Sequence, residues 1–175
     1  RGTGLLFVRN SLIDKLEPPL LDQHAAELIS PTEYLIRPDS KRFENWEQYC
    51  AGKYALGVAI DYALSWDLGA IQKRIYLLAD NLRQKLSQID GVRSTDDGVE
   101  KCGIITFTAN QLEPAAIKQA LSKQRINVST SGGAGNLVSF EKRGLKEVVR
   151  ASVHYFNTDE EIDHFVNVLE IIVAK

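Results

Sequence analysis

The sequence predicts an α+β fold in which helices pack on one face of an antiparallel sheet. Three observations carry this prediction. Residues 71–89 carry apolar side chains at intervals of three or four, the period of an amphipathic helix. Residues 102–108 and 148–155 are short runs rich in β-branched and aromatic residues, as strands are. Thr158 and Glu161 have the spacing of a capping box and precede a further helical pattern.

The first part of the chain is less regular. Residues 4–8 predict a short buried strand that is entered through glycines. Between Glu17 and Arg42, four prolines exclude a continuous helix, so we expect a long functional loop. Residues 46–62 follow a helical pattern that includes several small residues, and this predicts a helix packed tightly on more than one side.

The second part alternates helices and strands. After a break at residues 67–69 and the amphipathic helix, we expect strands at 92–94 and 102–108 and a helix that begins at Pro114. A strand at 126–130 is followed by a flexible segment from Ser131 to Gly144, then by the strand at 148–155 and the capped C-terminal helix. We place the domain boundary between residues 68 and 69.

The composition excludes several classes of function. The net charge of the 175 residues is −2, and no basic stripe interleaved with aromatic residues is present, so nucleic acid is a poor candidate partner. No apolar run has the length of a membrane span and no signal peptide is recognisable, which predicts a soluble, cytoplasmic protein. Two cysteines, Cys50 and Cys102, suggest neither a disulfide framework nor a metal site, and we expect both to be reduced and structural. Because the chain begins with Arg1 and lacks methionine, we expect it to be a piece of a longer protein.

Arg150 is the strongest candidate for a functional residue. It lies in an extended apolar segment whose alternation places Val149, Ala151, Val153 and Tyr155 on one face and Arg150, Ser152 and His154 on the other. A guanidinium held on a strand presents a rigid fork that matches a carboxylate in two-point geometry. The alternative is a solvated arginine at the edge of a sheet.

Other candidate sites are weaker. The glycine-rich run 131–136 could bind an anion through its backbone N–H groups, but it lacks the lysine and hydroxyl of a P-loop, and a mobile loop is the simpler interpretation. The three histidines, at positions 24, 154 and 164, do not have the spacing of metal ligands. Cys102 opens an isoleucine-rich strand, which favours a buried thiol over a nucleophile. His154 shares the face of Arg150 and could contact a ligand, but a packed or solvent-facing histidine is the simpler interpretation.

Three segments together resemble the class V aminotransferase-like family of fold-type-I pyridoxal phosphate enzymes. They are the opening Arg-Gly-Thr-Gly-Leu-Leu-Phe-Val at residues 1–8, the Arg-Phe-Glu at residues 42–44 that leads into a helix rich in small residues, and residues 150–163. The likeness runs in order along essentially the whole chain. Residues 126–129 and 152–155 are most similar to the branch of isopenicillin-epimerase-like and hercynylcysteine-sulfoxide-lyase-like proteins.

The resemblance implies a homodimeric enzyme that uses pyridoxal 5'-phosphate to act on an amino acid or derivative, as a C–S lyase, an epimerase or an aminotransferase. Residues 1–68 would be the end of the large cofactor-binding domain with an interface loop, and residues 69–175 would be the small C-terminal domain with its linking helix, in an α/β family context. The Schiff-base lysine would precede Arg1, so the fragment alone would be inactive and would hold no catalytic residue. Arg150 would bind the substrate α-carboxylate, and Arg1, Gly2 and Thr3 would lie near the cofactor.

Two departures from the family pattern stand out. Cysteine desulfurases of this family carry a catalytic cysteine on the loop that corresponds to residues 131–144, and no cysteine is present there, which disfavours sulfur transfer through a persulfide. Glu47 stands where many relatives have a phosphate-binding threonine, and its charge would repel a phosphate. These departures keep open the alternative of a non-catalytic ligand-binding or interaction module derived from the same fold.

Overall fold

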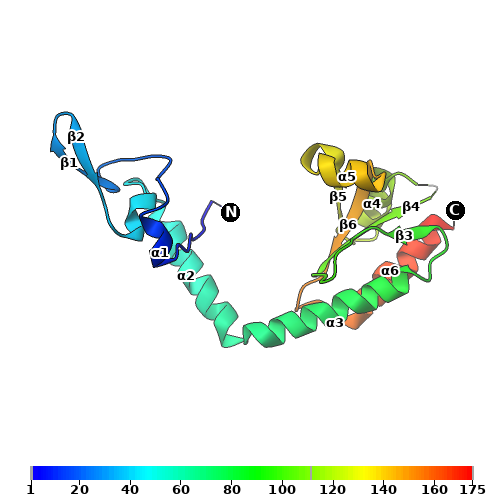
Figure 1. The fold of residues 1–175 in the computed structure, drawn as a ribbon. Coiled ribbons are helices and arrows are strands. Elements are labelled where there is room, and N and C mark those ends of the chain that lie inside the picture. Colours follow the sequence, from blue (N-terminus) through cyan, green and yellow to red (C-terminus); the bar gives the residue numbers. More distant parts are fainter. Residues whose placement is uncertain (1, 111, 175) are drawn as a thin grey trace. The chain divides into compact units, whose positions relative to one another are not determined.

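The computed structural model describes residues 2–110 and 112–174 and divides into two compact units, residues 1–65 and 66–175 (Figure 1). This division falls three residues before the boundary that we placed from the sequence. Helices and strands are mixed in the second unit, and its sheet is antiparallel. The α+β architecture predicted from the sequence is therefore confirmed.

The first unit consists of short elements and one long helix. Helix α1 (Asn10–Ile13) is followed by a two-stranded antiparallel hairpin of β1 (Ala26–Ser30) and β2 (Glu33–Ile36), by the 3-10 helix η1 (Ser40–Phe43) and by α2 (Cys50–Ser65). The prediction of a buried strand at residues 4–8 was wrong, because this segment is irregular and almost wholly exposed. The segment expected to be one long loop contains the hairpin and η1. Its prolines do not interrupt these elements, because Pro18 and Pro19 precede the hairpin, Pro31 lies in its turn and Pro38 lies between β2 and η1.

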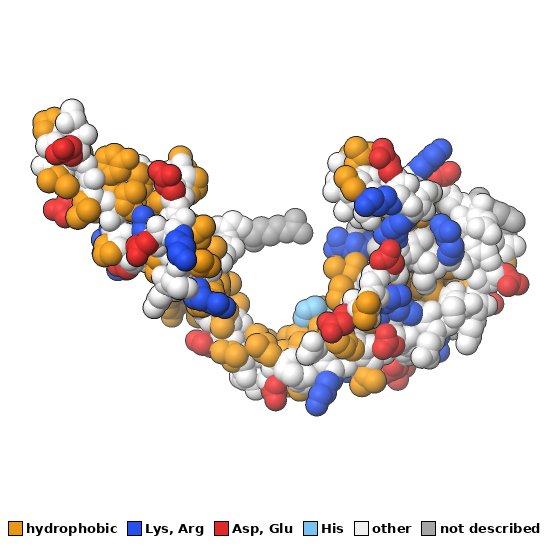
Figure 2. All heavy atoms as spheres, in the orientation of Figure 1, with side chains coloured by type: hydrophobic (Ala, Val, Ile, Leu, Met, Phe, Trp, Pro, Cys, Tyr) orange, Lys and Arg blue, Asp and Glu red, His pale blue; other side chains and the backbone are white. Residues whose placement is uncertain are grey.

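Helix α2 is apolar nearly all round, yet little of it is buried within its own unit. Gly52 is its only buried residue, whereas the side chains of Tyr54 and Val58 are 79% and 53% exposed. The helix is thus not packed tightly on several sides as expected from the sequence. Figure 2 shows hydrophobic side chains gathered over the surface of this unit. A helix without a polar face is typical of the interior of a larger protein.

The sheet of the second unit has four antiparallel strands in the order β3-β4-β6-β5. Their bounds are Val92–Ser94 for β3, Ile104–Ala109 for β4, Ser129–Gly132 for β5 and Glu147–Ser152 for β6. Helices α3 (Leu68–Leu86), α4 (Pro114–Lys123) and α6 (Asp159–Val173) contribute to the core that covers one face (Figure 1). All the strands predicted in this unit exist, with bounds shifted by a few residues.

The core of this unit follows from the two sequence periods. Ile105 pairs with Ala151, and Phe107 pairs with Val149, so alternate residues of β4 and β6 point to the helices. The helices meet them with residues spaced by three or four, which are Leu78, Leu82 and Leu86 of α3, Ile117 and Leu121 of α4, and Ile162, Phe165 and Leu169 of α6. The other face carries the polar residues Thr106, Arg150 and Ser152 together with the apolar residues Ile104 and Val148.

The segment from Ser131 to Gly144, which was predicted from the sequence to be flexible, contains regular secondary structure. It comprises the end of β5, the 3-10 helix η2 (Gly133–Gly135) and α5 (Leu137–Arg143). Gly144 ends α5 in the left-handed conformation (φ 62°), which glycine adopts without strain. The sequence did not suggest this helix because glycines flank it on both sides. Strand β6 also ends earlier than predicted, at Ser152, although burial still alternates as far as Tyr155.

The capping box predicted for the last helix is confirmed. The backbone N–H of Glu161 donates to Thr158 Oγ1 at 3.2 Å, and the backbone N–H of Thr158 donates to Glu161 Oε2 at 3.1 Å. These bonds satisfy two backbone donors that the first turn leaves without partners.

Replacing the cap should destabilise the protein modestly. We expect Thr158→Ala to lower the free energy of unfolding by about 1 kcal/mol, because a backbone donor loses its partner. Urea unfolding monitored by circular dichroism measures this, with Ser122→Ala on the exposed side of α4 as the control. Equal effects of the two substitutions would show that the cap contributes nothing specific.

Candidate functional site

Arg150 lies on the open face of the four-stranded sheet. It pairs with Thr106 of β4 on one side and with Ser129 of β5 on the other, and paired residues of antiparallel strands point to the same face. Ser152, two residues further along β6, shares this face. The guanidinium therefore belongs to a surface of hydroxyl-bearing residues, on a central strand rather than at an edge. The expected position at a sheet edge was therefore wrong, whereas Arg150 is exposed to solvent, as that alternative expected.

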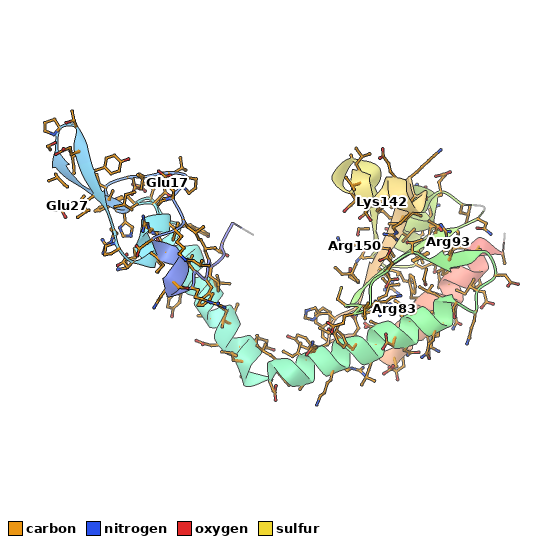
Figure 3. All side chains as sticks on the ribbon, viewed as in Figure 1. Glu17, Glu27, Arg83, Arg93, Lys142 and Arg150 are labelled. Carbon is orange, nitrogen blue, oxygen red and sulfur yellow. The ribbon has the colours of Figure 1, made fainter. Side chains whose placement is uncertain are left out.

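The charge of Arg150 is not neutralised by the protein. Within the described part of the chain, its one side-chain hydrogen bond is that of Nε with Ser152 Oγ at 3.4 Å, and it forms no salt bridge. Arg83, by contrast, forms salt bridges with Asp80 and Asp96. Figure 3 labels both arginines and shows Arg150 on β6. An unpaired, exposed guanidinium on a rigid strand is suited to bind a carboxylate.

A groove of about 690 Å³ begins at Arg150. One wall is the first half of α3, with Leu68, Ile71, Gln72, Ile75 and Tyr76. The other wall is the end of the sheet, where Cys102, Gly103, Ile104, Ser152, Val153 and His154 join Arg150. The groove thus combines one guanidinium, that of Arg150, with a wall of largely aliphatic side chains. Its volume lies within the range of small-molecule sites.

The narrow contact between α3 and the sheet depends on Gly103. A Cβ atom at this position would lie 2.6 Å from Ile75 Cγ2 and 2.7 Å from the carbonyl oxygen of Val153, so that no larger residue fits without displacement. Arg83 holds the preceding residue, because its Nη2 donates to the carbonyl oxygen of Cys102 at 2.7 Å. Its Nε donates to Asp96 at 2.8 Å, and both side chains are largely buried. The position of the groove rim is therefore fixed by packing and by a buried ion pair.

Both cysteines are exposed, so the expectation that Cys102 is a buried thiol was wrong. Cys102 precedes β4 instead of opening it, so its side chain is not drawn into the core and lines the groove with Arg150. His154 also lines the groove, and its ring lies against Tyr155 and Phe156, with centroid distances of 4.5 and 4.8 Å. The structure thus brings together three of the residues that the sequence singled out.

The aliphatic wall is the part of the site that sequence reasoning missed. Ile71 and Ile75 continue the apolar stripe of α3, and the stripe predicts core positions for both. Both are only partly buried, whereas Leu78 and Leu82 beneath the sheet are fully buried. The length of the apolar stripe on α3 could have revealed this wall, because the stripe extends beyond the strands that the helix covers.

Gly2 and Thr3 line a second pocket, of about 510 Å³, within the first unit. Arg1, the third residue named from the resemblance, lies outside the described residues. Gly52 at the start of α2 has no Cβ and so lets Thr3 and Tyr49 approach the helix closely. The structure therefore places Gly2 and Thr3 beside the loop that precedes α2.

A phosphate does not fit the lining of this second pocket. Glu44 and Glu47 contribute two carboxylates, against one lysine, Lys53, whose Nζ donates to Gln48 Oε1. The hydrogen bond from Gln48 Nε2 keeps the pKa of Glu44 below its ordinary value, and the neighbouring His24 acts in the same direction. Glu44 is therefore ionised at neutral pH and repels an anion.

The loop that carries these carboxylates is held by a small polar network. Asp22 accepts hydrogen bonds from the backbone N–H groups of Trp46 at 2.6 Å and of His24 at 2.8 Å. The bond from Trp46 is the main reason that the pKa of Asp22 is lowered. His24 Nε2 lies 3.3 Å from Glu44 Oε2, and Gln48 Nε2 donates to the same oxygen at 3.2 Å.

This network predicts a pH dependence of stability. A carboxyl whose pKa is lowered in the folded state stabilises the protein above its unfolded pKa, and the contribution is lost as the pH falls through the folded value. For Glu44 the loss begins below its ordinary pKa of 4.5. We expect the wild type to be more stable than Glu44→Gln at neutral pH and the two unfolding curves to converge in acid. Urea unfolding at a series of pH values measures the difference, and a constant difference would contradict the assignment.

Two further features, a metal-binding cluster and a membrane-spanning helix, are absent from the described residues. These residues contain no group of three or more His, Cys, Asp or Glu residues that could bind a metal ion. None of the helices in residues 2–110 and 112–174 combines the length and the apolar character that crossing a bilayer demands.

Comparison with known proteins identifies the family to which this fold and this site belong. The chain matches solved structures, among them the apo cysteine desulfurase of Thermococcus onnurineus, with a TM-score of 0.87 and 26% identity over 96% of this chain and 42% of that one. The model of the family Aminotransferase class-V matches residues 1–165. The chain belongs to this family.

One further relative supports the family, and one further solved structure shares the fold. A probable cysteine desulfurase of Methanothermobacter thermautotrophicus is 30% identical over 99% of this chain and 44% of its own length. The cystine C–S lyase C-DES, solved as a mutant with glycine linked to its pyridoxal phosphate cofactor, has a TM-score of 0.74 and 21% identity over 94% of this chain and 40% of that one. Pyridoxal phosphate is the cofactor of the family to which the chain belongs.

The chain spans less than half the length of these relatives. The shares that are covered do not confirm the expectation that it is the C-terminal part of such a protein. The relatives named above are cysteine desulfurases and a C–S lyase, so the epimerase-like and sulfoxide-lyase-like branch remains a prediction from the sequence.

Proposed function

We propose that the full-length protein is a pyridoxal phosphate-dependent enzyme of the C–S lyase type that acts on an amino acid, and that Arg150 binds the α-carboxylate of the substrate. The single observation that carries this proposal is the unpaired guanidinium of Arg150 on the open sheet face. Its neighbours Thr106 and Ser129 bear hydroxyl groups, which can donate to a carboxylate as well. The cofactor supplies an electron sink for the amino acid, and the protein supplies orientation.

The role of Arg150 is to fix the amino acid at one end. A bidentate contact between the guanidinium and the carboxylate restricts rotation of the bound substrate. The bonds at the substrate Cα are thereby held in one orientation. The groove beside Arg150 then receives the side chain. Since the acidic pocket of the first unit does not suit a phosphate, we assign the cofactor phosphate to residues other than Glu44 and Glu47, and Gly2 and Thr3 remain candidates for cofactor contact only through their backbone.

The exposed apolar surface of α2 supports a larger assembly. Tyr54 and Val58 leave aliphatic and aromatic surface uncovered, and exposed apolar patches of this kind mark surfaces that other protein segments cover. We infer that the full-length protein is a homodimer, as the family resemblance implies, and analytical ultracentrifugation measures this. A cytoplasmic location stays a prediction from the sequence. The alternative of a non-catalytic module gains no support from relatives that are named as enzymes.

The experiment that tests the function uses the full-length protein. The absorbance of the bound cofactor is recorded while L-cysteine and other amino acids are added, and sulfide and the amino-acid product are quantified. The proposal predicts a spectral change on addition of the substrate and release of reduced sulfur from a sulfur-containing amino acid. A protein that binds no cofactor, or whose cofactor spectrum responds to no amino acid, would contradict it.

A further inference from the structure

The groove beside Arg150 is larger and more aliphatic than the binding of cysteine requires. Leu68 and Ile71 stand on successive turns of α3 and face the groove without any charged neighbour among its lining residues on that helix. Ile75 lies deeper, against the position of Gly103. On the sheet side, Ile104 and Val153 add two more aliphatic side chains.

One cationic side chain and several aliphatic side chains therefore line the same groove. Arg150 is the one arginine or lysine of the lining, and it forms no ion pair within the described part of the chain. A ligand that complements this surface carries a carboxylate at one end and a hydrocarbon or thioether chain at the other. A short polar side chain would leave the aliphatic wall in contact with water.

We propose that this groove selects amino acids with an extended apolar side chain, several non-hydrogen atoms longer than that of cysteine. The proposal rests on the proposed function, since it takes Arg150 as the carboxylate site. It names Leu68, Ile71 and Ile75 as the residues that determine specificity. Leu68 and Ile71 contact the side chain of the substrate, and Ile75 forms the base of the groove.

Cys102 provides a built-in reporter for occupancy of the groove. Its thiol is exposed and lies in the same lining as Arg150, so a bound ligand should slow its alkylation. The test treats the full-length protein with iodoacetamide and measures modification of the peptide that contains Cys102 by mass spectrometry. The probes are the unbranched carboxylates acetate, propionate, butyrate, pentanoate and hexanoate, which lack the amino group needed to react with the cofactor.

The expected result is protection of Cys102 at concentrations that fall by about fourfold for each added methylene, the factor that burial of one methylene contributes. Ile71→Gln should flatten this dependence on chain length while acetate binds as before. Leu77→Gln is the matched control, because Leu77 lies on the same helix, is 67% exposed and does not line the groove.

Each contrary outcome has a distinct meaning. If all the carboxylates protect equally and Arg150→Ala abolishes the protection, the carboxylate site stands and the proposed selectivity is wrong. If Leu77→Gln flattens the dependence as much as Ile71→Gln does, the aliphatic wall is not the cause. If no carboxylate protects Cys102, the binding site at Arg150 is itself contradicted.

Discussion

Arg150→Ala is expected to lower kcat/KM of the full-length enzyme for its amino-acid substrate by about 10²- to 10³-fold, which corresponds to about 3–4 kcal/mol of lost charge-assisted binding. The effect is large because the described lining of the groove contains no lysine or second arginine that could replace the guanidinium of Arg150. Steady-state kinetics with the purified enzyme measures it.

Two variants separate this role from a general effect of positive charge. Arg150→Lys keeps the charge but loses the two-point fork, so we expect it to recover only part of the activity. Arg93→Ala removes an exposed arginine from β3 of the same sheet, outside the groove, and should change kcat/KM little (Figure 3). Similar losses in Arg93→Ala and Arg150→Ala would indicate that the sheet attracts anions without a specific site.

Phe107→Ala is expected to give the largest loss of stability, about 3–5 kcal/mol, the usual cost of removing a buried aromatic ring. Phe107 is fully buried in β4 and meets the ring of Phe165 of α6 edge to face, with centroids 6.2 Å apart. The substitution leaves a cavity between the sheet and the helices and removes a favourable aromatic contact.

Urea unfolding of the protein measures this change, and Leu77→Ala on the exposed side of α3 is the control. We expect the control to change the free energy of unfolding by less than about 0.5 kcal/mol, as surface substitutions usually do. A loss below about 1 kcal/mol in Phe107→Ala would mean that the core relaxes around the missing ring and that the sheet is not held by it.

The second unit was largely predictable because its signals are local. Its strands alternate, its helices repeat every three or four residues, and Thr158 with Glu161 marks a helix start without reference to the rest of the fold. The alternation around Arg150 also predicted which side chains would share its face, and burial follows that alternation from Val149 to Tyr155.

The first unit was less predictable, for a physical reason. The segment at residues 4–8 and helix α2 are apolar, and apolar residues predict burial, but this unit has few buried residues of its own. Hydrophobicity in a sequence indicates that a segment will be covered, but it does not identify the part of the protein that covers it. The same limit applies to the groove wall, since Ile71 is indistinguishable by period from Leu78 although only Leu78 lies beneath the sheet.

The central claim is that Arg150 recognises a carboxylate, and the most direct measurement compares an acid with its amide. Dissociation constants of L-cysteine and L-cysteinamide are measured from the cofactor absorbance of the wild-type enzyme and of Arg150→Ala. We predict that the wild type prefers the acid by about 10²-fold, since a charge-assisted two-point contact is lost in the amide, and that the variant binds both with nearly equal affinity. A preference for the acid that survives unchanged in Arg150→Ala would show that another residue holds the carboxylate.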